Sequence, residues 1–505
     1  MGSVWSASDP RRTGDVEGGT GTTRRSPRVE ATLATEPRTD EYSTGAASSV
    51  SVIAIVESRA DRASVHICDQ LRDLVAWNAR EDETRPDADG GGTYYRTDGF
   101  ELRSFEALHL DLVDPAAAFS EEPDLLVFAS RHSGETGPLL TAHFTGNVGP
   151  AEFGGEPNAF ADAAPNALAE LLAAYDRYAP DRYEVGMECT HHGPTAVGCP
   201  SLFAELGSDD EQWDDPEGAE AVARAILELR GVPAHRTDPE TGRPRQVVGF
   251  GGGHYVPRFE RIVRETPWAV GHIAADWGLD ELDDRDAVET VVRRAFAATD
   301  ADVAVVEGTK PDLRSVIEEL GHRVEREAWV REVDDRPLSL VDAVETALGP
   351  IADGVRFGDR ETEAFEVVSL PTDLVTTAEG VDPERTWDAV TAHAVAVETS
   401  NGGSRLGGRA AIPTDTDADR TARGLPRSLV DALADVIRPE FERVSVTDAG
   451  VEVVETAFDP SLARDLGVPD GPLFGELASG EAVTVDGRQI EPEEVHERRT
   501  TQFPC

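Results

Sequence analysis

Short apolar runs alternate with amphipathic stretches along the middle of the chain. Residues 51–56 (SVIAIV), 125–129 (LLVFA) and 247–250 (VVGF) have the length and composition of buried strands. Residues 168–178 and 218–231 instead repeat apolar positions at helical spacing. This alternation of strands and helices predicts an α/β fold, a three-layer α/β/α sandwich with a mixed or parallel sheet.

Several of the predicted strands end directly before polar residues. A helix is expected after Asp61, whose carboxylate suits an N-cap, and further strands are expected at 182–187 and 301–306. The strands at 125–129, 182–187 and 247–250 run into segments rich in histidine, serine or glycine, and the strand at 301–306 ends near Lys310. Because ligands of open α/β sheets bind beyond the carboxyl ends of strands, we expect the functional site at this edge.

The same pattern divides the chain into three parts. Residues 1–48 are rich in Gly, Ser, Thr, Arg and Pro without apolar periodicity, which predicts a disordered N-terminal extension or an incorrectly assigned start. Residues 49–330 carry the strand and helix alternation and are predicted to form the main α/β domain. Residues 331–505 are expected to form a C-terminal α+β extension, with a flexible loop at 401–427 where Gly, Thr and Asp are concentrated.

Composition narrows the setting in which the protein works. The 505 residues are 39% hydrophobic, which suffices for two or three domains, and no apolar run approaches the roughly 20 residues of a membrane span. No apolar block marks the N-terminus as a secretory signal. Four cysteines form no disulfide framework, and the spacing of Cys189 and Cys199 is not that of a zinc ribbon. We expect a cytoplasmic protein.

The net charge of −50 comes from 97 acidic residues spread along the chain against 47 bases. Dispersed acid of this kind is tolerable where salt screens it, since the Debye length falls to about 3 Å at 1 M salt. The charge therefore indicates a cytosol with molar salt, and the alternative is a chain that binds cations or basic partners. Bulk repulsion is muted at such salt, so a local arginine pocket could still bind RNA.

The densest candidate chemistry lies in Glu188-Cys189-Thr190-His191-His192-Gly193-Pro194. Glu188, His191 and His192 could bind metal or transfer protons, whereas the alternative is a set of hydrogen-bonded turn residues. Neighbouring residues of a regular strand face opposite sides, so both imidazoles cannot be ligands there. The turn at Gly193 relaxes this limit, and one histidine could bind metal while its neighbour acts as base or oxyanion donor.

Other candidates are more isolated. His254 follows three glycines, including Gly252 and Gly253, and lies beside Tyr255 and Arg258, which is typical of a binding loop rather than a plain turn.

Three further histidines and one lysine have two readings each. His132, His143 and His272 are candidates for the site or satisfied core groups. Lys310 is the single lysine of the chain. It could bind phosphate or carboxylate, or it could have been retained by chance where arginine replaced lysine elsewhere.

Motifs that the chain lacks also restrict the function. There is no G-x-S-x-G, no G-x-x-x-x-G-K-[ST], no H-E-x-x-H, and no G-x-G-x-x-G placed after a strand and followed by a spaced acidic residue. These absences argue against serine hydrolases, P-loop NTPases and dinucleotide-binding enzymes. Metal-assisted or histidine-assisted hydrolysis remains.

Several motifs, in order, resemble the archaeal and plant type of D-aminoacyl-tRNA deacylase, here in a haloarchaeal form. The motifs are Ser130–Ser133, Leu140–His143 through Gly146-Asn147, Glu188–Thr195, Glu205–Ser208 and Gly251–Arg258, extended by Gly271–Ala274 and Gly308–Lys310. The resemblance covers about residues 50–325 and places catalysis in the domain at 49–330.

This resemblance implies a monomeric, zinc-dependent enzyme with two zinc ions per subunit. It would hydrolyse the ester that joins a D-amino acid to the tRNA 3′ end, and its substrates could include glycine mischarged on tRNA(Ala). No obligate protein partner and no membrane are expected. An L side chain would be rejected by a steric clash in the pocket.

On this hypothesis the residues divide into three roles. The metal ligands come from Glu188, His191, His254 and His272. His192, Glu188 and His132 carry catalysis, with His192 as base or oxyanion donor. The substrate contacts come from Gly252, Gly253, Tyr255, Arg258, His143 and Lys310.

Two alternatives stay open. In the first, the reaction is metal-free: histidines orient the terminal adenosine and its 2′ hydroxyl assists the attack. In the second, the protein is a tRNA-binding or zinc-binding module that does not turn over substrate.

Overall fold

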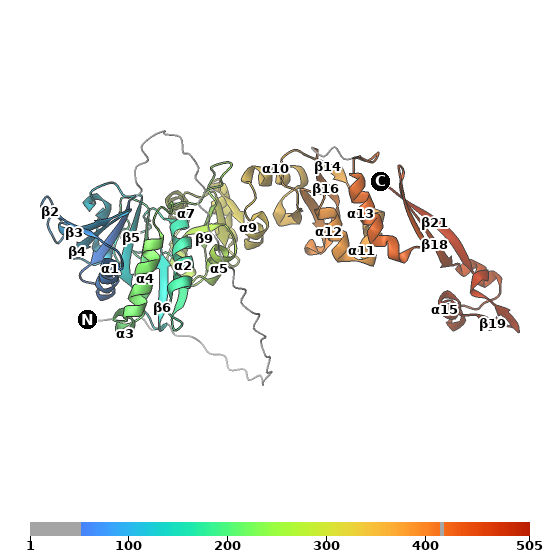
Figure 1. Cartoon of the computed structure of the whole chain (residues 1–505), viewed down its shortest axis with the longest axis horizontal. Helices are drawn as coiled ribbons and strands as arrows, with labels where there is room; N and C mark the ends of the chain where they lie inside the picture. Colours follow the sequence, from blue (N-terminus) through green and yellow to red (C-terminus); the bar gives the residue numbers. More distant parts are fainter. Residues whose placement is uncertain (1–51, 415–418) are drawn as a thin grey trace. The chain divides into compact units, whose positions relative to one another are not determined.

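The computed structural model describes residues 52–414 and 419–505 (Figure 1). The predicted N-terminal extension at 1–48 lies outside the described residues. Among the helices that are described, none has the length and apolar character needed to cross a membrane.

The first sheet has eight strands in the order β2-β3-β4-β1-β5-β8-β6-β7. Its strands are β1 (Ile53–Ser58), β2 (Asn78–Asp82), β3 (Gly92–Thr97), β4 (Phe100–Phe105), β5 (Leu125–Arg131), β6 (Leu139–His143), β7 (Glu184–Met187) and β8 (Ser201–Gly207). β1 pairs in parallel with β4 and β5, and β5 pairs in parallel with β8. β6 runs antiparallel to β8, so the sheet is mixed, as the pattern predicted.

Helices α1 (Arg62–Leu74), α2 (Pro165–Tyr178) and α4 (Pro216–Glu228) pack along this sheet, and the single turn α3 (Asp210–Trp213) follows β8 (Figure 1). Asp61 caps α1 as expected, because its carboxylate accepts hydrogen bonds from the backbone N–H groups of Ala63 and Ser64. The opposite face carries a separate apolar cluster that includes Phe128 of β5 and Phe203 of β8.

The second sheet is parallel, with four strands in the order β10-β9-β11-β12. They are β9 (Gln246–Phe250), β10 (Ala269–Ala274), β11 (Val303–Val306) and β12 (Arg323–Glu325), and the helices between them are α5 (Pro257–Glu265), α6 (Asp276–Asp280), α7 (Arg285–Thr299) and α8 (Pro311–Glu319). Successive side chains of a strand face opposite sides, so Val247 joins the core shared with α2 while Val248 joins the core formed with α7 and α8. The strands predicted at 247–250 and 301–306 therefore belong to a sheet of their own. Apolar runs identify strands but not their hydrogen-bonding partners.

The remaining elements form smaller sheets and helices, in agreement with the predicted C-terminal α+β extension. Helices α9 (Glu327–Val333) and α10 (Leu338–Leu348) precede an antiparallel sheet in the order β13-β15-β16-β14. Its strands are β13 (Val355–Phe357), β14 (Phe365–Ser369), β15 (Ala396–Ser400) and β16 (Arg405–Pro413), with helices α11 (Thr372–Val381), α12 (Pro383–Thr391) and α13 (Arg427–Ile437). The last elements are β17 (Arg443–Thr447), β18 (Gly450–Phe458), α14 (Pro460–Asp465), α15 (Pro472–Ala478), β19 (Val483–Val485), β20 (Arg488–Ile490) and β21 (His496–Pro504).

The flexible loop expected at 401–427 is wrong over part of its length. β16 occupies residues 405–413 as an inner strand between β15 and β14. Ala410, Ala411 and Ile412 are fully buried, and this burial outweighs the low strand propensity of the glycines before them. The domain boundary near residue 330 remains a prediction.

Candidate functional site

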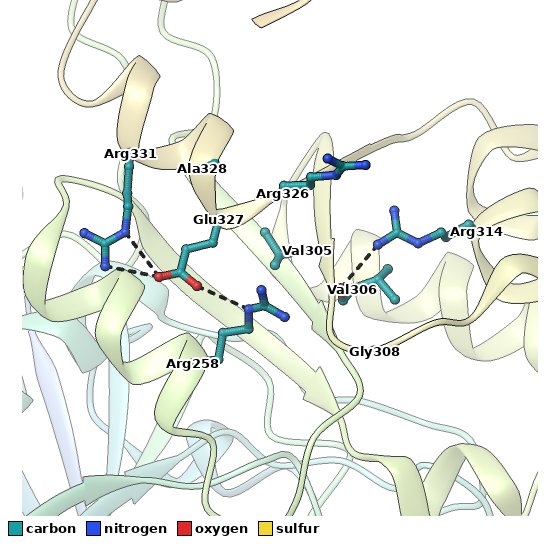
Figure 2. A pocket seen from close by; sticks show the side chains of 9 residues that line it. All are labelled: Arg258, Val305, Val306, Gly308, Arg314, Arg326, Glu327, Ala328 and Arg331. Atoms are coloured by element: carbon teal, nitrogen blue, oxygen red, sulfur yellow. Dashed lines mark hydrogen bonds and ion pairs between the residues drawn. The ribbon is translucent and has the colours of Figure 1, made fainter. Parts of the chain in front are cut away.

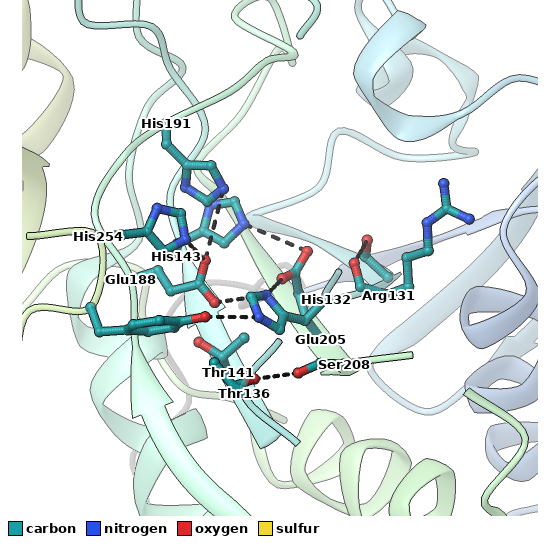
Figure 3. Close-up of polar contacts among 12 residues, drawn as sticks. Arg131, His132, Thr136, Thr141, His143, Glu188, His191, Glu205, Ser208 and His254 are labelled. Carbon is teal, nitrogen blue, oxygen red and sulfur yellow. Dashed lines mark hydrogen bonds and ion pairs between the residues drawn. The ribbon is translucent and has the colours of Figure 1, made fainter. Parts of the chain in front are cut away.

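Five segments from the two sheets meet around a cluster of histidines and carboxylates (Figure 3). His132 follows β5, His143 ends β6, Glu188 follows β7, Glu205 lies within β8 and His254 follows β9. Because β6 runs antiparallel to β8, the pairing sets Thr141 opposite Glu205 and His143 opposite Phe203. The site therefore lies across the middle of β8 as well as beyond the carboxyl ends of β5 and β7, where the sequence predicted it.

Three histidines share one hydrogen-bonding arrangement. Nδ1 of His143 lies 3.0 Å from the carbonyl of Phe144, and Nδ1 of His191 lies 2.9 Å from that of Cys189. Nδ1 of His192 lies 2.7 Å from the carbonyl of Gly193. A carbonyl only accepts hydrogen bonds, so each Nδ1 carries the proton and each Nε2 is left with a free lone pair in the neutral ring.

These three rings also face one another. The ring centroids of His191 and His192 are 4.4 Å apart. The ring centroid of His143 lies 4.4 Å from that of His191 and 4.7 Å from that of His192. One ring nitrogen from each of the three lies within 4.8 Å of the others. Burial lowers the pKa of His191 well below its usual value and that of His192 to about 4, so both rings are neutral at pH 7. Neutral imidazoles with a second nitrogen fixed on a carbonyl are the form in which histidine binds metals.

His143 completes this group and also faces Glu205. Its Nε2 is buried without a hydrogen-bond partner among the described residues and lies 3.6 Å from Oε1 of Glu205. Burial lowers the pKa of His143, but the nearby Glu205 carboxylate outweighs burial and raises it. An orphaned buried nitrogen beside two other such lone pairs fits a metal ion.

A second group consists of an imidazole between two carboxylates. Nδ1 of His132 lies 3.0 Å from Oε1 of Glu188 and 3.6 Å from Oε2 of Glu205, and all three side chains are buried. Burial disfavours charge on His132, yet the two carboxylates raise its pKa to about 10. Burial likewise opposes charge on Glu205, but His132 and His143 lower its pKa to about 2. The raised pKa favours the imidazolium form of His132 in the metal-free protein. His132, Glu188 and Glu205 also place one possible ligand atom each within 4.8 Å of one another, so this group too could hold a metal ion.

Glu188 connects the two groups. Its Oε2 accepts a hydrogen bond from Nε2 of His254 at 2.9 Å and lies 3.8 Å from Nε2 of His191. Burial raises the pKa of Glu188, but the hydrogen-bonding His132 and His254 hold it well below its usual value. Cys189, His191 and His254 offer a further group of possible ligand atoms, although burial raises the pKa of the Cys189 thiol.

Tyr255 lies at the solvent side of this network. Its hydroxyl is 3.1 Å from Nε2 of His132, and the residue is 39% exposed. Partial burial raises the pKa of Tyr255 to about 12, so the phenol stays protonated. Tyr255 is thus positioned to meet an incoming molecule and the buried imidazolium together.

The structure does not bring His272 into this cluster, and its expected role as a metal ligand is wrong for the geometry shown. His272 is fully buried in β10, with Nε2 2.8 Å from the carbonyl of Ala161 and Nδ1 3.0 Å from Oγ1 of Thr190. Both ring nitrogens are therefore occupied. Burial lowers its pKa to about 4, as expected of a neutral core histidine.

The residues expected to bind substrate divide between two places. Gly252 has a positive φ of 88° in the loop before His254, which suits glycine. Lys310 pairs with Asp276 at 2.5 Å, and Nε of Arg258 donates to Glu327 at 3.2 Å. Arg258 lines a separate cavity, whose lining includes none of the clustered histidines (Figure 2).

Glu205 belongs to the cluster although the sequence assigned it no role. It contacts both His132 and His143 from within β8 and is buried. The signal that could have found it is a single carboxylate inside the apolar run SLFAELG, because an acidic residue is rarely buried without a partner.

Comparison with known proteins agrees with this geometry. A family model described as D-aminoacyl-tRNA deacylase matches residues 119–327, a range that contains every histidine of the cluster. A D-aminoacyl-tRNA deacylase of Halorubrum lacusprofundi is 52% identical over 90% of this chain and 97% of the relative. Proteins of the same name from Natronomonas pharaonis and Haloarcula marismortui are 50% and 49% identical, each over 90% of this chain and 100% of the relative.

Proposed function

Because this chain belongs to the D-aminoacyl-tRNA deacylase family, we propose that it hydrolyses the ester bond of D-aminoacyl-tRNA, releasing a D-amino acid and free tRNA. The observation that carries this conclusion is the identity of about half the residues over nearly the whole length of named relatives. We also propose that it acts in the cytoplasm, from the translation-related role of its named relatives. Action on glycine mischarged on tRNA(Ala), and the monomeric state, remain predictions.

We propose that His143, His191 and His192 hold a zinc ion through their Nε2 atoms. Three imidazoles with one open position are the ligand set of a catalytic zinc site, and backbone carbonyls fix all three rings. A zinc ion bound there would supply a Lewis acid for an ester carbonyl and for water. This assignment makes both adjacent histidines ligands and moves His143 from substrate contact to metal binding.

The remaining groups would act on the ester through charge and hydrogen bonding. His132, held as an imidazolium by Glu188 and Glu205, can donate its Nε2–H to an oxygen on which negative charge develops. In the free protein the hydroxyl oxygen of Tyr255 accepts a hydrogen bond from this N–H. When a substrate oxygen replaces the Tyr255 hydroxyl as the acceptor, Tyr255 can donate its own hydroxyl proton to the substrate. Glu188 would orient His132 and His254, and its lowered pKa makes it a weak general base.

A second zinc ion, implied by resemblance, would need a different ligand set. The group Cys189, His191 and His254 shares His191 with the first site, which leaves Cys189 and His254 as donors for a second ion. The carboxylate of Glu188, 2.9 Å from Nε2 of His254, is a further donor at the same place. The loop at Gly252 and Gly253 would place the terminal adenosine or the amino acid against this cluster.

The test is deacylation of matched D-tyrosyl-tRNA and L-tyrosyl-tRNA in molar KCl, with and without chelator, together with elemental analysis. We expect release of D-tyrosine only, loss of activity with chelator, and recovery with zinc. Full activity in chelator-treated protein that holds no zinc would support the metal-free alternative, in which the tRNA 2′ hydroxyl assists. If the protein binds aminoacyl-tRNA but releases no amino acid, the result would support the second alternative, a binding module without turnover.

A further inference from the structure

A cavity of about 450 Å³ has four arginines among its nine lining residues (Figure 2). Arg258 contributes from the first turn of α5, Arg314 from α8, Arg326 from the residue before α9, and Arg331 from α9. The rest of the lining consists of Val305, Val306, Gly308, Glu327 and Ala328.

The charge of this cavity is opposite to that of the chain. Glu327 is the one carboxylate among the lining residues, against four guanidinium groups, in a protein whose net charge is −50. Hydrogen bonds from Arg261, outside the cavity, and from Arg331 and Arg258 lower the pKa of Glu327 to about 2. Glu327 pairs with Arg258 and Arg331, and Arg331 also pairs with Glu265 outside the cavity. The positive charge left without a carboxylate partner is that of Arg314 and Arg326.

Two of the four arginines lack a carboxylate partner. Within the part of the chain that the structure describes, the Arg326 guanidinium makes no hydrogen bond or ion pair, and that of Arg314 reaches only the carbonyl of Val306 at 3.3 Å. Arg258 uses Nε alone, on Glu327. A guanidinium carries five N–H donors, so most of the donors in this cavity are free to meet an anion.

The position of the cavity connects it to the hydrolytic site. Val306 and Gly308 lie at the carboxyl end of β11, the place where parallel α/β sheets bind ligands. Arg258 follows His254 and Tyr255 in the same loop and the first turn of α5, so this segment contributes to both places. A second cavity of about 340 Å³ shares Arg326 and Ala328 with the first and adds Arg356.

We infer that this arginine cavity binds phosphodiester groups of the tRNA strand near its 3′ end. The inference rests on the proposed function, which sets the ester of that strand in the neighbouring cluster. Arginine forks match phosphate oxygens, and phosphate contacts position a nucleic acid without reading its sequence. Two adjoining cavities that share Arg326 favour a linear polyanion over a single free phosphate.

The test compares a double variant in the cavity with a matched double variant elsewhere. R314Q/R326Q removes the two arginines without carboxylate partners, and R224Q/R285Q removes the same charge from exposed helix positions. Each protein is assayed in molar KCl on D-tyrosyl-tRNA and on D-tyrosyl-adenosine, which has the ester but no phosphate.

For R314Q/R326Q we expect KM for D-tyrosyl-tRNA to rise about tenfold, with hydrolysis of D-tyrosyl-adenosine unchanged. The R224Q/R285Q control should match the wild type on both substrates. An unchanged KM for the tRNA substrate, or equal losses on both substrates, would overturn the inference. A third outcome would also overturn it: millimolar inorganic phosphate competes with D-tyrosyl-tRNA, yet KM for the tRNA substrate is unchanged in R314Q/R326Q. Phosphate would then bind somewhere other than this cavity. A wild-type protein that hydrolyses neither substrate would instead overturn the proposed function.

Discussion

The hydroxyl of Tyr255 lies 3.1 Å from Nε2 of His132, although the two residues follow strands of different sheets. Tyr255 also forms an isolated β-bridge with Glu188, the carboxylate on the other side of His132. The loop after β9 therefore closes the network that begins at β5 and β7. The two sheets are joined at the point where the candidate chemistry lies.

Replacing Tyr255 with phenylalanine removes one hydroxyl from this network. We expect kcat on D-aminoacyl-tRNA to fall about tenfold with bound zinc unchanged, because a donor to the developing charge is lost while the three-histidine group is intact. Steady-state kinetics and elemental analysis measure the two quantities. Tyr178→Phe, which removes a hydroxyl paired with Glu228 on the surface, is the control. An unchanged kcat, or a variant without zinc, would contradict the assigned role.

Removing one imidazole from the group His143, His191 and His192 should abolish metal binding there. We expect His192→Ala to lose about one zinc ion per chain and nearly all activity, since three protein ligands are the minimum of such sites. His143→Ala should do the same but also leaves a cavity in the core, so its melting temperature is measured alongside. His393→Ala is the control, because its ring lies outside the cluster, with Nδ1 2.8 Å from the carbonyl of Ala389 in α12. If His192→Ala retains its full zinc content, the assignment of His192 as a ligand is contradicted.

Glu205→Gln should change the pH dependence of the reaction. His132 has a pKa raised to about 10 by Glu188 and Glu205, so the active imidazolium is present at neutral pH and is lost as the pH rises through that value. With one carboxylate gone, the pKa of His132 falls, and the alkaline limb of the kcat/KM profile should move down by about 1 pH unit or more. Profiles of wild type, Glu205→Gln and the surface control Glu228→Gln measure this. An alkaline limb that stays in place in Glu205→Gln would show that His132 does not control it.

Asp238 lies outside the histidine cluster, and its hydrogen bonds lead to a prediction about stability. Its buried carboxylate accepts hydrogen bonds from Thr241, from the Arg245 guanidinium at 2.6 Å and from the backbone N–H of Leu338 at 3.1 Å. Burial raises its pKa, but these bonds outweigh burial and lower it to about 2 from 3.8.

The sign follows from that lowered pKa. The stabilisation is fully present above about pH 4 and is lost as the pH falls towards 2, an effect of about 2 kcal/mol. Asp238→Asn should lower the free energy of unfolding at pH 7 by about 3 kcal/mol, since it leaves the buried Arg245 charge unpaired. Urea titrations at pH 7 and pH 3 measure both effects, with the exposed pair variant Asp435→Asn as control. Equal stability of Asp238→Asn and wild type at pH 7 would contradict this account.

The sequence by itself determined the elements and much of the candidate chemistry. Apolar runs located strands such as β5 and β9, and Asp61 marked the start of α1, because burial and capping are local properties of the chain. The cluster from Glu188 to His192 was evident from residue types alone, and its motifs identified the family. Only the tertiary structure decided which strands share a sheet. It also showed that both ring nitrogens of His272 have hydrogen-bond partners in the core, and that Glu205 lies between His132 and His143. Those facts depend on which distant segments pair with one another, and the periodicity of one segment does not identify its partner.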